Sequence, residues 1–230
     1  MKAMIFATGT GYKFKSPLND ISPVLECIQG KPVIEHVILQ LKEAGVDEIM
    51  INIRQQGEQI TDFLAARNNF DSKIYLSEYN YLLDTGGGIK KAASFLRGKE
   101  PFIIHDAGFI PNLNLKKLYR CHKETNPLST LLVSKQLQPS SMIFSKSNRL
   151  CGWYNNETGE IKSHYPYTDP HKYNEYAFSG IHILSPGIFD WMENRSGKFS
   201  LIDLYLSIYS RTNIQACLLE NVSRMSYSYP

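Results

Sequence analysis

Two glycines near the start of the chain stand where backbone amides could bind phosphate. Gly9 and Gly11 follow directly on the compact apolar run of residues 3–7, and Lys13 and Lys15 come next. Glycine lets backbone N–H groups approach phosphate oxygens closely, and the two lysines would add positive charge. The same residues would also suit an ordinary tight turn. The sequence therefore predicts that residues 2–13 form a strand and loop facing a nucleotide, with the simple turn as the alternative.

Two common phosphate-binding motifs do not fit this loop. A P-loop requires the pattern GxxxxGK[ST], which is absent. A dinucleotide-binding fold requires GxGxxG, and then an acidic residue about 20 positions further on at the end of the second strand. Phe14 takes the place of the third glycine, and the second expected strand ends in Asn52, Ile53 and Arg54 with no acid. Both alternatives are therefore disfavoured.

The composition limits the class of protein. With 230 residues the chain is long enough for one large domain with a well-buried core. The net charge of +3, without any basic run, does not indicate nucleic-acid binding. No apolar run approaches the roughly 18 residues of a membrane span, and the first residues do not resemble a signal peptide, so we expect a cytoplasmic protein with no membrane partner. Structural zinc and disulfides are not expected, because no CxxC pair occurs among Cys27, Cys121, Cys151 and Cys217.

The first half of the chain alternates short apolar strands with amphipathic helices. Strands are expected at residues 3–7, 48–53, 73–77, 101–105 and 129–134, and helices at residues 32–44, 59–66, 87–96 and 115–122. This order predicts an α/β fold of Rossmann-like type, with a mostly parallel mixed sheet and helices on both faces. Ligands in such folds lie beyond the carboxyl ends of the strands. The site is therefore expected at residues 8–13, 54–57, 78–88 and 105–110.

The second half has a different pattern. Residues 142–144, 149–154 and 160–163 are expected to form a small antiparallel sheet, residues 164–174 an exposed loop, residues 176–184 a strand and residues 201–209 a helix. No linker separates the halves. We therefore expect a single domain over residues 1–230, with a nucleotide-binding half at residues 1–134. Residues 135–230 would cap it and build the far, sugar-side wall of the cleft.

Three blocks of sequence carry a resemblance to a known family. They are Gly9-Thr-Gly-Tyr-Lys13, Gly30-Lys-Pro-Val-Ile-Glu-His36 and Asp84-Thr-Gly-Gly-Gly-Ile89. In order and spacing they resemble the sugar-1-phosphate nucleotidyltransferase family, and most of all its short, single-domain bacterial branch of uridylyl- and guanylyltransferases. The resemblance runs from Met1 to about residue 219.

The resemblance implies a reaction, its partners and a set of residues. A sugar-1-phosphate oxygen attacks the α-phosphorus of a nucleoside triphosphate in line and displaces pyrophosphate, while Mg²⁺ and cationic side chains neutralise charge. An oligomer is compatible with the sequence. By resemblance, Ala7, Thr8, Gly9 and Gly11 would line the nucleotide, Lys13 would face the triphosphate, Thr85, Gly86 and Gly87 would face the base, and Phe178, Ser179 and Gly180 would border the sugar.

The chain departs from the family pattern at four places. Lys13 stands where the loop usually carries arginine, which keeps the charge but loses the bidentate fork. Pro23 falls where a second lysine is usual, and Gly108 falls where the Mg²⁺-binding aspartate is usual. The closing acidic segment that would give a second metal carboxylate is missing, so the C-terminus is expected to be short, whether native or truncated. Asp203 and Glu220 are the nearest candidates for that carboxylate, although Asp203 also suits the start of its own helix.

Asp106 is the nearest replacement for the metal-binding aspartate. It lies two positions before Gly108, so both residues share a face if the segment is extended. Asp106 would serve as the catalytic and metal-binding carboxylate after a displacement of about 6–7 Å along the strand. The alternative is a solvated residue at the end of a strand.

Two functions are consistent with these residues. The first is an enzyme that uses Mg²⁺, Lys13 and Asp106 for nucleotidyl transfer. The alternative is a catalytically silent relative that binds a nucleotide, a nucleotide-sugar or a partner protein. The role of His105 stays open between a structural histidine and a residue that contacts a ligand. His36 is expected on a helix surface or at an interface.

Overall fold

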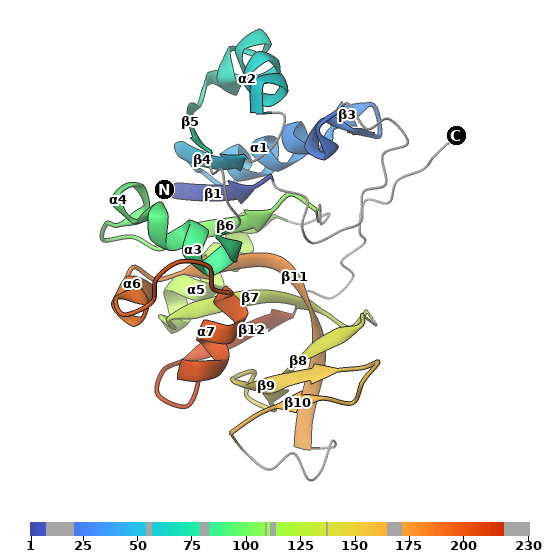
Figure 1. Ribbon diagram of the computed structural model, residues 1–230, viewed down its shortest axis with the longest axis vertical. Helices are drawn as coiled ribbons and strands as arrows, with labels where there is room; N and C mark the ends of the chain where they lie inside the picture. Colours follow the sequence, from blue (N-terminus) through green and yellow to red (C-terminus); the bar gives the residue numbers. More distant parts are fainter. Residues whose placement is uncertain are drawn as a thin grey trace.

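A ten-stranded sheet runs through both halves of the chain (Figure 1). The computed structural model describes residues 1–7, 21–53, 57–78, 83–108, 110, 114–136, 138–164 and 172–218. Along one path the strands follow the order β10-β9-β8-β11-β6-β1-β4-β5, while β7 pairs with both β11 and β12. The predicted fold class, a mixed α/β sheet with helices, is confirmed.

The first half of the chain forms the parallel part of the sheet. Parallel ladders join β1 to β4 and to β6, and join β4 to β5. The strands are β1 (Lys2–Phe6), β4 (Glu48–Ile53), β5 (Lys73–Glu78) and β6 (Phe102–Asp106). The four predicted strands are confirmed, with ends shifted by no more than one residue, because compact apolar runs are typical of buried parallel strands.

The second half joins the sheet through the long strand β11 (Tyr173–Leu184). One edge of β11 is antiparallel to β6, and the other edge pairs first with β8 and then with β7. The other strands are β7 (Ser129–Ser134), β8 (Ser140–Ser145), β9 (Leu150–Asn155), β10 (Ile161–Lys162) and β12 (Ile214–Leu218). The predicted antiparallel strands are confirmed, and β11 makes them continuous with the main sheet. The predicted loop ends earlier than residue 174, because β11 begins at Tyr173.

Helices cover both faces of the sheet. One face carries α1 (Val33–Glu43), α2 (Gly57–Ala66) and α5 (Leu115–Thr125), and the other carries α3 (Asp84–Lys91), α4 (Ala93–Leu96), α6 (Ile188–Met192) and α7 (Leu201–Ile208). Two single 3₁₀ turns are η1 (Pro23–Leu25) and η2 (Asn68–Asp71). No helix of the described residues is both long and apolar enough to cross a membrane.

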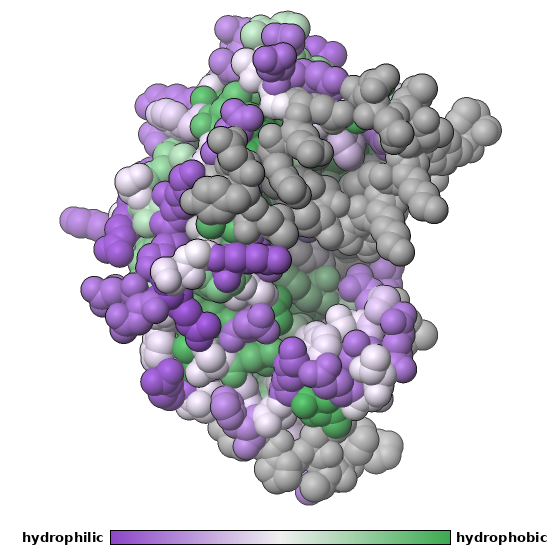
Figure 2. All heavy atoms as spheres, viewed as in Figure 1, coloured by the Kyte–Doolittle hydropathy of each residue, from purple (hydrophilic) through white to green (hydrophobic). Residues whose placement is uncertain are grey.

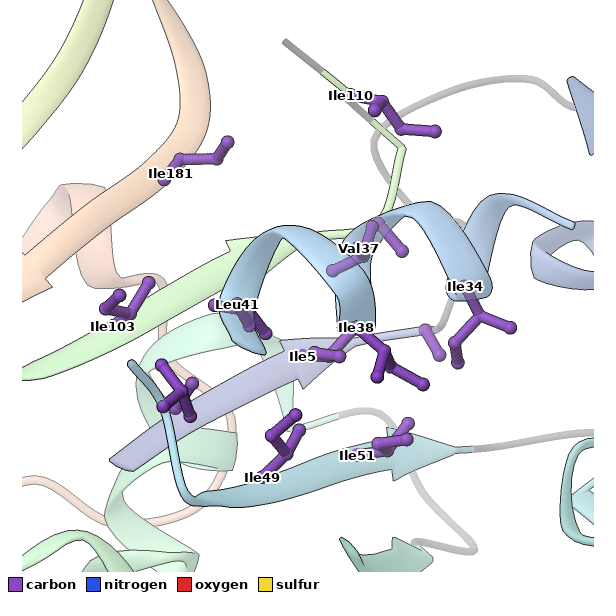
Figure 3. Packing of buried hydrophobic residues seen from close by; sticks show 14 of the residues in the cluster. Ile5, Ile34, Val37, Ile38, Leu41, Ile49, Ile51, Ile103, Ile110 and Ile181 are labelled. Carbon is purple, nitrogen blue, oxygen red and sulfur yellow. The ribbon is translucent and has the colours of Figure 1, made fainter. Parts of the chain in front are cut away.

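Each face of the sheet buries its own apolar core. Alternation along the strands sends Ile5 and Ile51 toward α1, where they pack with Ile38 and Leu41 (Figure 3). Met4 and the other even-numbered residues of β1 face the second core, under α3 and α7. In Figure 2, hydrophilic side chains line the left-hand edge of the molecule, whereas apolar side chains show through a hollow near the middle, around the place of β7 and β11 in Figure 1.

The Gly30–His36 block forms a hairpin that leads into α1. The short strands β2 (Cys27–Ile28) and β3 (Lys31–Pro32) are joined by Gln29 and Gly30, with φ of 50° and 77°. Positive φ at both central residues is the conformation that tight hairpins favour. His36 Nε2 lies 2.8 Å from the carbonyl oxygen of Ile28. His36 therefore ties the hairpin to the helix and has a structural partner.

The prediction of one helix over residues 87–96 is wrong at its start and in its middle. α3 begins at Asp84, and Ala92 separates it from α4. Glycine has low helix propensity, so the sequence alone indicated a later start. The backbone N–H groups of Gly86 and Gly87 both point to the carbonyl oxygen of Phe199, at 3.1 and 3.3 Å. This carbonyl satisfies donors that the first turn of a helix leaves free, and so stabilises the glycine-rich start.

His122, on α5, is fully buried between two hydroxyl groups. Its Nδ1 lies 2.9 Å from Thr130 Oγ1 and its Nε2 lies 2.9 Å from Ser185 Oγ. Ser185 Oγ donates to the carbonyl oxygen of Pro127 (2.6 Å). It therefore accepts from His122 Nε2–H, and Thr130 donates to Nδ1. The neutral ring satisfies both partners, and burial lowers the pKa of His122 to about 4.

We expect the free energy of unfolding to fall as the pH is lowered from 6.5 toward 4. The unfolded chain protonates His122 near its ordinary pKa of about 6.5, whereas the folded chain protonates it only near 4, so stability is lost as the pH falls through this window. Each extra proton bound by the unfolded chain adds a slope of about 1.4 kcal/mol per pH unit. Urea unfolding at pH 7, 6 and 5 measures this dependence of the free energy of unfolding on pH.

The matched variants are His122→Gln and His164→Gln, the second at an exposed histidine. The first should show a shallower pH dependence than the wild type, and the second should not. An unchanged slope in His122→Gln would contradict the expectation.

Candidate functional site

Asp106 ends β6 at the carboxyl edge of the parallel strands. Its Oδ1 accepts a hydrogen bond from the backbone N–H of Gly108 (2.9 Å), which closes the turn after the strand. Asp106 is half-buried, and burial raises the pKa of its carboxyl group while the hydrogen bond from Gly108 opposes that rise. Asp106 does end its strand, but its side chain is only partly exposed, and its role as a catalytic and metal-binding carboxylate stays a prediction. Gly108, at the position where the family has aspartate, acts here as a turn residue.

Residues 179–181 form a bulge in β11. The pairing of β11 with β7 changes register between Phe178 and His182. The Ser179 hydroxyl fills the resulting gap, because its Oγ donates to the carbonyl oxygen of Leu132 (2.9 Å) and accepts from the N–H of Ile181 (3.3 Å). Ser179 is buried, so this hydroxyl is committed to the protein. Its place beside a sugar stays a prediction.

Gly180 lies directly against Asp106. Its φ is 81°, a conformation that residues with a side chain rarely adopt. A Cβ at this position would lie 2.8 Å from Asp106 Cβ and 3.5 Å from Asp106 Oδ2. Only glycine therefore allows β11 to approach the carboxylate this closely. The structure thus brings the predicted metal residue together with the predicted sugar border.

A buried polar chain supports the bulge from the side of α7. His182 Nδ1 lies 3.0 Å from Tyr205 Oη, and Ser129 Oγ lies 2.8 Å from the same hydroxyl. The ring of Phe178 packs edge-on against His182, with centroids 5.1 Å apart. Burial lowers the pKa of His182 to about 3, so its ring is neutral near pH 7. Sequence reasoning missed this chain, because its members come from different elements and form no local motif.

Gly86, Gly87 and Gly88 each pack closely against a different part of the protein. A Cβ on Gly86 would lie 2.3 Å from Phe199 Cε2, one on Gly87 would lie 2.7 Å from the carbonyl oxygen of Gly197, and one on Gly88 would lie 2.8 Å from Phe6 Cε1. These glycines therefore hold α3 against β1 and against the segment before α7. Because Gly86 and Gly87 also donate their N–H groups to Phe199, the role predicted for them beside a base remains a prediction.

Thr85 and Asp203 both take part in the packing of helix starts. Thr85 Oγ1 accepts the backbone N–H of Leu201 (3.1 Å), which ties the first turn of α3 to that of α7. The N–H of Asp203 donates to Ser200 Oγ (3.4 Å) in the first turn of α7. A carboxylate at this position is favoured by the helix dipole. This agrees with the helix-start role expected for Asp203.

The ends of β1, β4 and β6 are aligned at the carboxyl edge. Phe6 pairs with Asn52 on one side and with Asp106 on the other. Ala7 is buried one residue beyond β1, and its N–H donates to the carbonyl oxygen of Asn52 (3.0 Å). The other residues predicted to hold the nucleotide, and one candidate carboxylate, lie outside the described part of the chain: Thr8, Gly9, Gly11, Lys13 and Glu220.

His105 is fully buried on the opposite face from Asp106, in the core under α1 and α5. Its Nδ1 lies 3.0 Å from the carbonyl oxygen of Asp106, and its Nε2 has no hydrogen-bond partner among the described residues. Burial lowers the pKa of His105 to about 4, so the ring is neutral near pH 7. The choice between a structural role and a ligand contact stays a prediction.

Asp106 fits one part of a magnesium site. Mg²⁺ is commonly held by one or two carboxylates together with substrate phosphates. Asp106 takes part in none of the ion pairs found among the described residues. In the same residues there is no group of three or more His, Cys, Asp or Glu side chains that could hold a metal ion. Within the described part of the chain, Asp106 would therefore provide one ligand of such a site.

The chain belongs to the nucleotidyl transferase family, because the sequence profile of that family matches residues 2–219. The predicted family is thereby confirmed. Curated relatives include N-acetylmuramate alpha-1-phosphate uridylyltransferase of Neisseria meningitidis, 35% identical over 122 residues, which are 52% of each chain. Mannose-1-phosphate guanylyltransferase 1 of Arabidopsis thaliana is 27% identical over 85% of this chain and 53% of its own length. The chain thus spans about half the length of these relatives.

Solved structures support the fold. HddC from Yersinia pseudotuberculosis, complexed with GMP-PN, has a TM-score of 0.75 at 21% identity, over 97% of this chain and 93% of that chain. UDP-glucose pyrophosphorylase complexed with UDP-glucose has a TM-score of 0.74 at 17% identity, over 97% and 91%. At these identities the likeness shows that the fold is shared.

We expect Gly180→Ala to destabilise the protein by about 2–3 kcal/mol. Backbone strain at positive φ contributes about 1 kcal/mol, and the contact of the new Cβ with Asp106 adds the cost of overpacking. Gly159→Ala is the matched control, because Gly159 has a φ of 75° but open space where its Cβ would lie. Urea unfolding of both variants separates strain from contact. Equal losses in the two variants would show that Asp106 does not press on Gly180.

Proposed function

We propose that this chain transfers a nucleotidyl group from a nucleoside triphosphate to a sugar-1-phosphate and releases pyrophosphate. The observation that carries the proposal is the contact of Asp106 with Gly180, which sets a half-buried carboxylate against the strand predicted to border the sugar. Family membership supports it. The names of the relatives support a uridylyl- or guanylyltransferase.

The reaction needs no covalent nucleophile from the protein. An oxygen of the sugar-1-phosphate forms a bond to the α-phosphorus of the triphosphate. The bond from that phosphorus to the oxygen that bridges to the β-phosphate breaks, and pyrophosphate leaves with the electron pair. The protein contributes by holding both substrates in line and by stabilising negative charge.

Asp106 and Lys13 would supply the charged groups. Mg²⁺, when bound, would neutralise charge on the phosphates. Asp106 would hold it, with the Gly108 N–H fixing the orientation of the carboxylate. Lys13, from the glycine loop, would add positive charge beside the triphosphate. Gly180 would set the distance between the carboxylate and the bound sugar.

A second candidate is a catalytically silent relative that binds a nucleotide or nucleotide-sugar. Gly108 at the expected aspartate position and Lys13 in place of arginine favour it. Removing one positioned group of this kind often lowers the rate by about 10² to 10³. The two candidates differ in turnover rather than in binding.

We expect Asp106→Asn to lower the rate of pyrophosphate release by about 10² or more, because the amide cannot supply a metal-binding carboxylate. The assay combines the protein and Mg²⁺ with each of UTP, GTP, dTTP and CTP and a panel of sugar-1-phosphates. Asp190→Asn, at an exposed residue of α6, is the matched control and should keep the wild-type rate.

Pyrophosphate release that Asp106→Asn leaves unchanged would contradict the role of Asp106. If the wild type binds a nucleotide but releases no pyrophosphate with any pair, the silent relative is the correct function.

A further inference from the structure

Asn52 places a buried amide group at the carboxyl edge of the sheet. Its side chain is on the last residue but one of β4, and the residue is only 2% exposed. Among the described residues, its Nδ2 finds no hydrogen-bond acceptor. Buried donors in native proteins are nearly always paired, and an unpaired one is costly. A buried donor without an acceptor in the described part of the chain, at the edge where the ligand is expected, suggests an acceptor that arrives with the ligand.

Strand register puts Asn52 in one row with the candidate metal residue. Asn52 pairs with Phe6, and Phe6 pairs with Asp106. Residues that pair directly lie on the same face of a sheet, and Phe6 belongs to the core under α3. Adjacent strands are about 4.8 Å apart, so Asn52 and Asp106 lie about 10 Å from each other on that face. This separation is comparable to that between the base and the phosphates of a nucleotide.

The surroundings of Asn52 favour an uncharged partner. Its neighbours on the same face of β1 and β4 are the apolar side chains of Met4, Phe6 and Met50, and Gly88 closes over Phe6 from α3. A phosphate buried there would need compensating charge, which these side chains do not offer. The hydroxyl of Ser77, which pairs with Asn52 from β5, is polar but uncharged. The planar, uncharged part of a nucleotide suits a mostly apolar wall with a few polar groups.

We infer that the Asn52 amide donates a hydrogen bond to a keto oxygen of the nucleotide base, and so helps to select bases that carry one. This inference rests on the proposed function. Asp106 would then lie beside the phosphates of the bound nucleotide, and Asn52, in the same row of side chains, would lie beside its base. Uracil and guanine carry keto oxygens, whereas adenine has none.

The experiment measures binding of UTP, GTP and ATP to the full chain by calorimetry, in the wild type, Asn52→Leu and Asn52→Asp. We expect both variants to weaken the binding of the preferred keto base by about ten-fold, as for one lost hydrogen bond, and to leave any weak ATP binding unchanged. Because the Nδ2 of Asn52 has no hydrogen-bond acceptor among the described residues, Asn52→Leu should not lower the thermal midpoint of ligand-free protein.

Asn213→Leu is the matched control. Asn213 also carries a buried side-chain atom, its Oδ1, without a partner among the described residues, but it precedes β12 at the amino edge of the sheet. It should leave nucleotide binding unchanged.

Three results would overturn the inference. They are unchanged keto-base binding in both Asn52 variants, equal weakening for ATP, and a large fall in the thermal midpoint of ligand-free Asn52→Leu. If the wild type binds none of the three nucleotides, the proposed function fails as well, and this result is distinct from the other three.

Discussion

The pairing of β1 with a parallel strand on each side is the constraint on which the site depends. Because β4 and β6 both run parallel to β1 and in register with it, their carboxyl ends stop at one level. Side chains far apart in sequence, at Asn52, Phe6 and Asp106, therefore share a row and a face. The backbone hydrogen bonds between the strands and the two apolar cores fix this row. A slip of one residue would move the side chains of each core to the opposite face of the sheet.

The second half of the chain packs against this row of side chains at the bulge of β11. Ser179 restores hydrogen bonds that the change of register would otherwise leave unmade. Gly180 then fits against Asp106 because it has no side chain. The chain of His182, Tyr205 and Ser129 holds the strand from behind with neutral groups. The Asp106 carboxylate thus faces a strand, β11, that is held in place by packing and neutral hydrogen bonds rather than by charged groups.

The sequence predicted the strands and the family far better than it predicted the site. The ends of apolar runs such as residues 48–53 nearly coincide with the ends of the strands that form. A strand buried on both faces needs apolar residues at consecutive positions, and this pattern is visible in the local sequence. The early start of α3 was missed, because glycine propensity is local while the stabilising carbonyl of Phe199 lies more than a hundred residues away. The bulge was missed for the same reason, since Ser179 finds its acceptor at Leu132. Asn52 entered the sequence argument only as a missing acid, because an unpaired amide can be recognised only when its surroundings are known.

We propose Asp106 as the carboxylate through which Mg²⁺ assists nucleotide binding, although the family pattern has its aspartate at the position of Gly108. The most direct test is calorimetric titration of the wild type and Asp106→Asn with UTP and GTP, with and without Mg²⁺. If Asp106 holds Mg²⁺, then Mg²⁺ strengthens binding of one of these nucleotides to the wild type, and Asp106→Asn loses most of that gain. An equal effect of Mg²⁺ on both proteins, or none on the wild type, would contradict it.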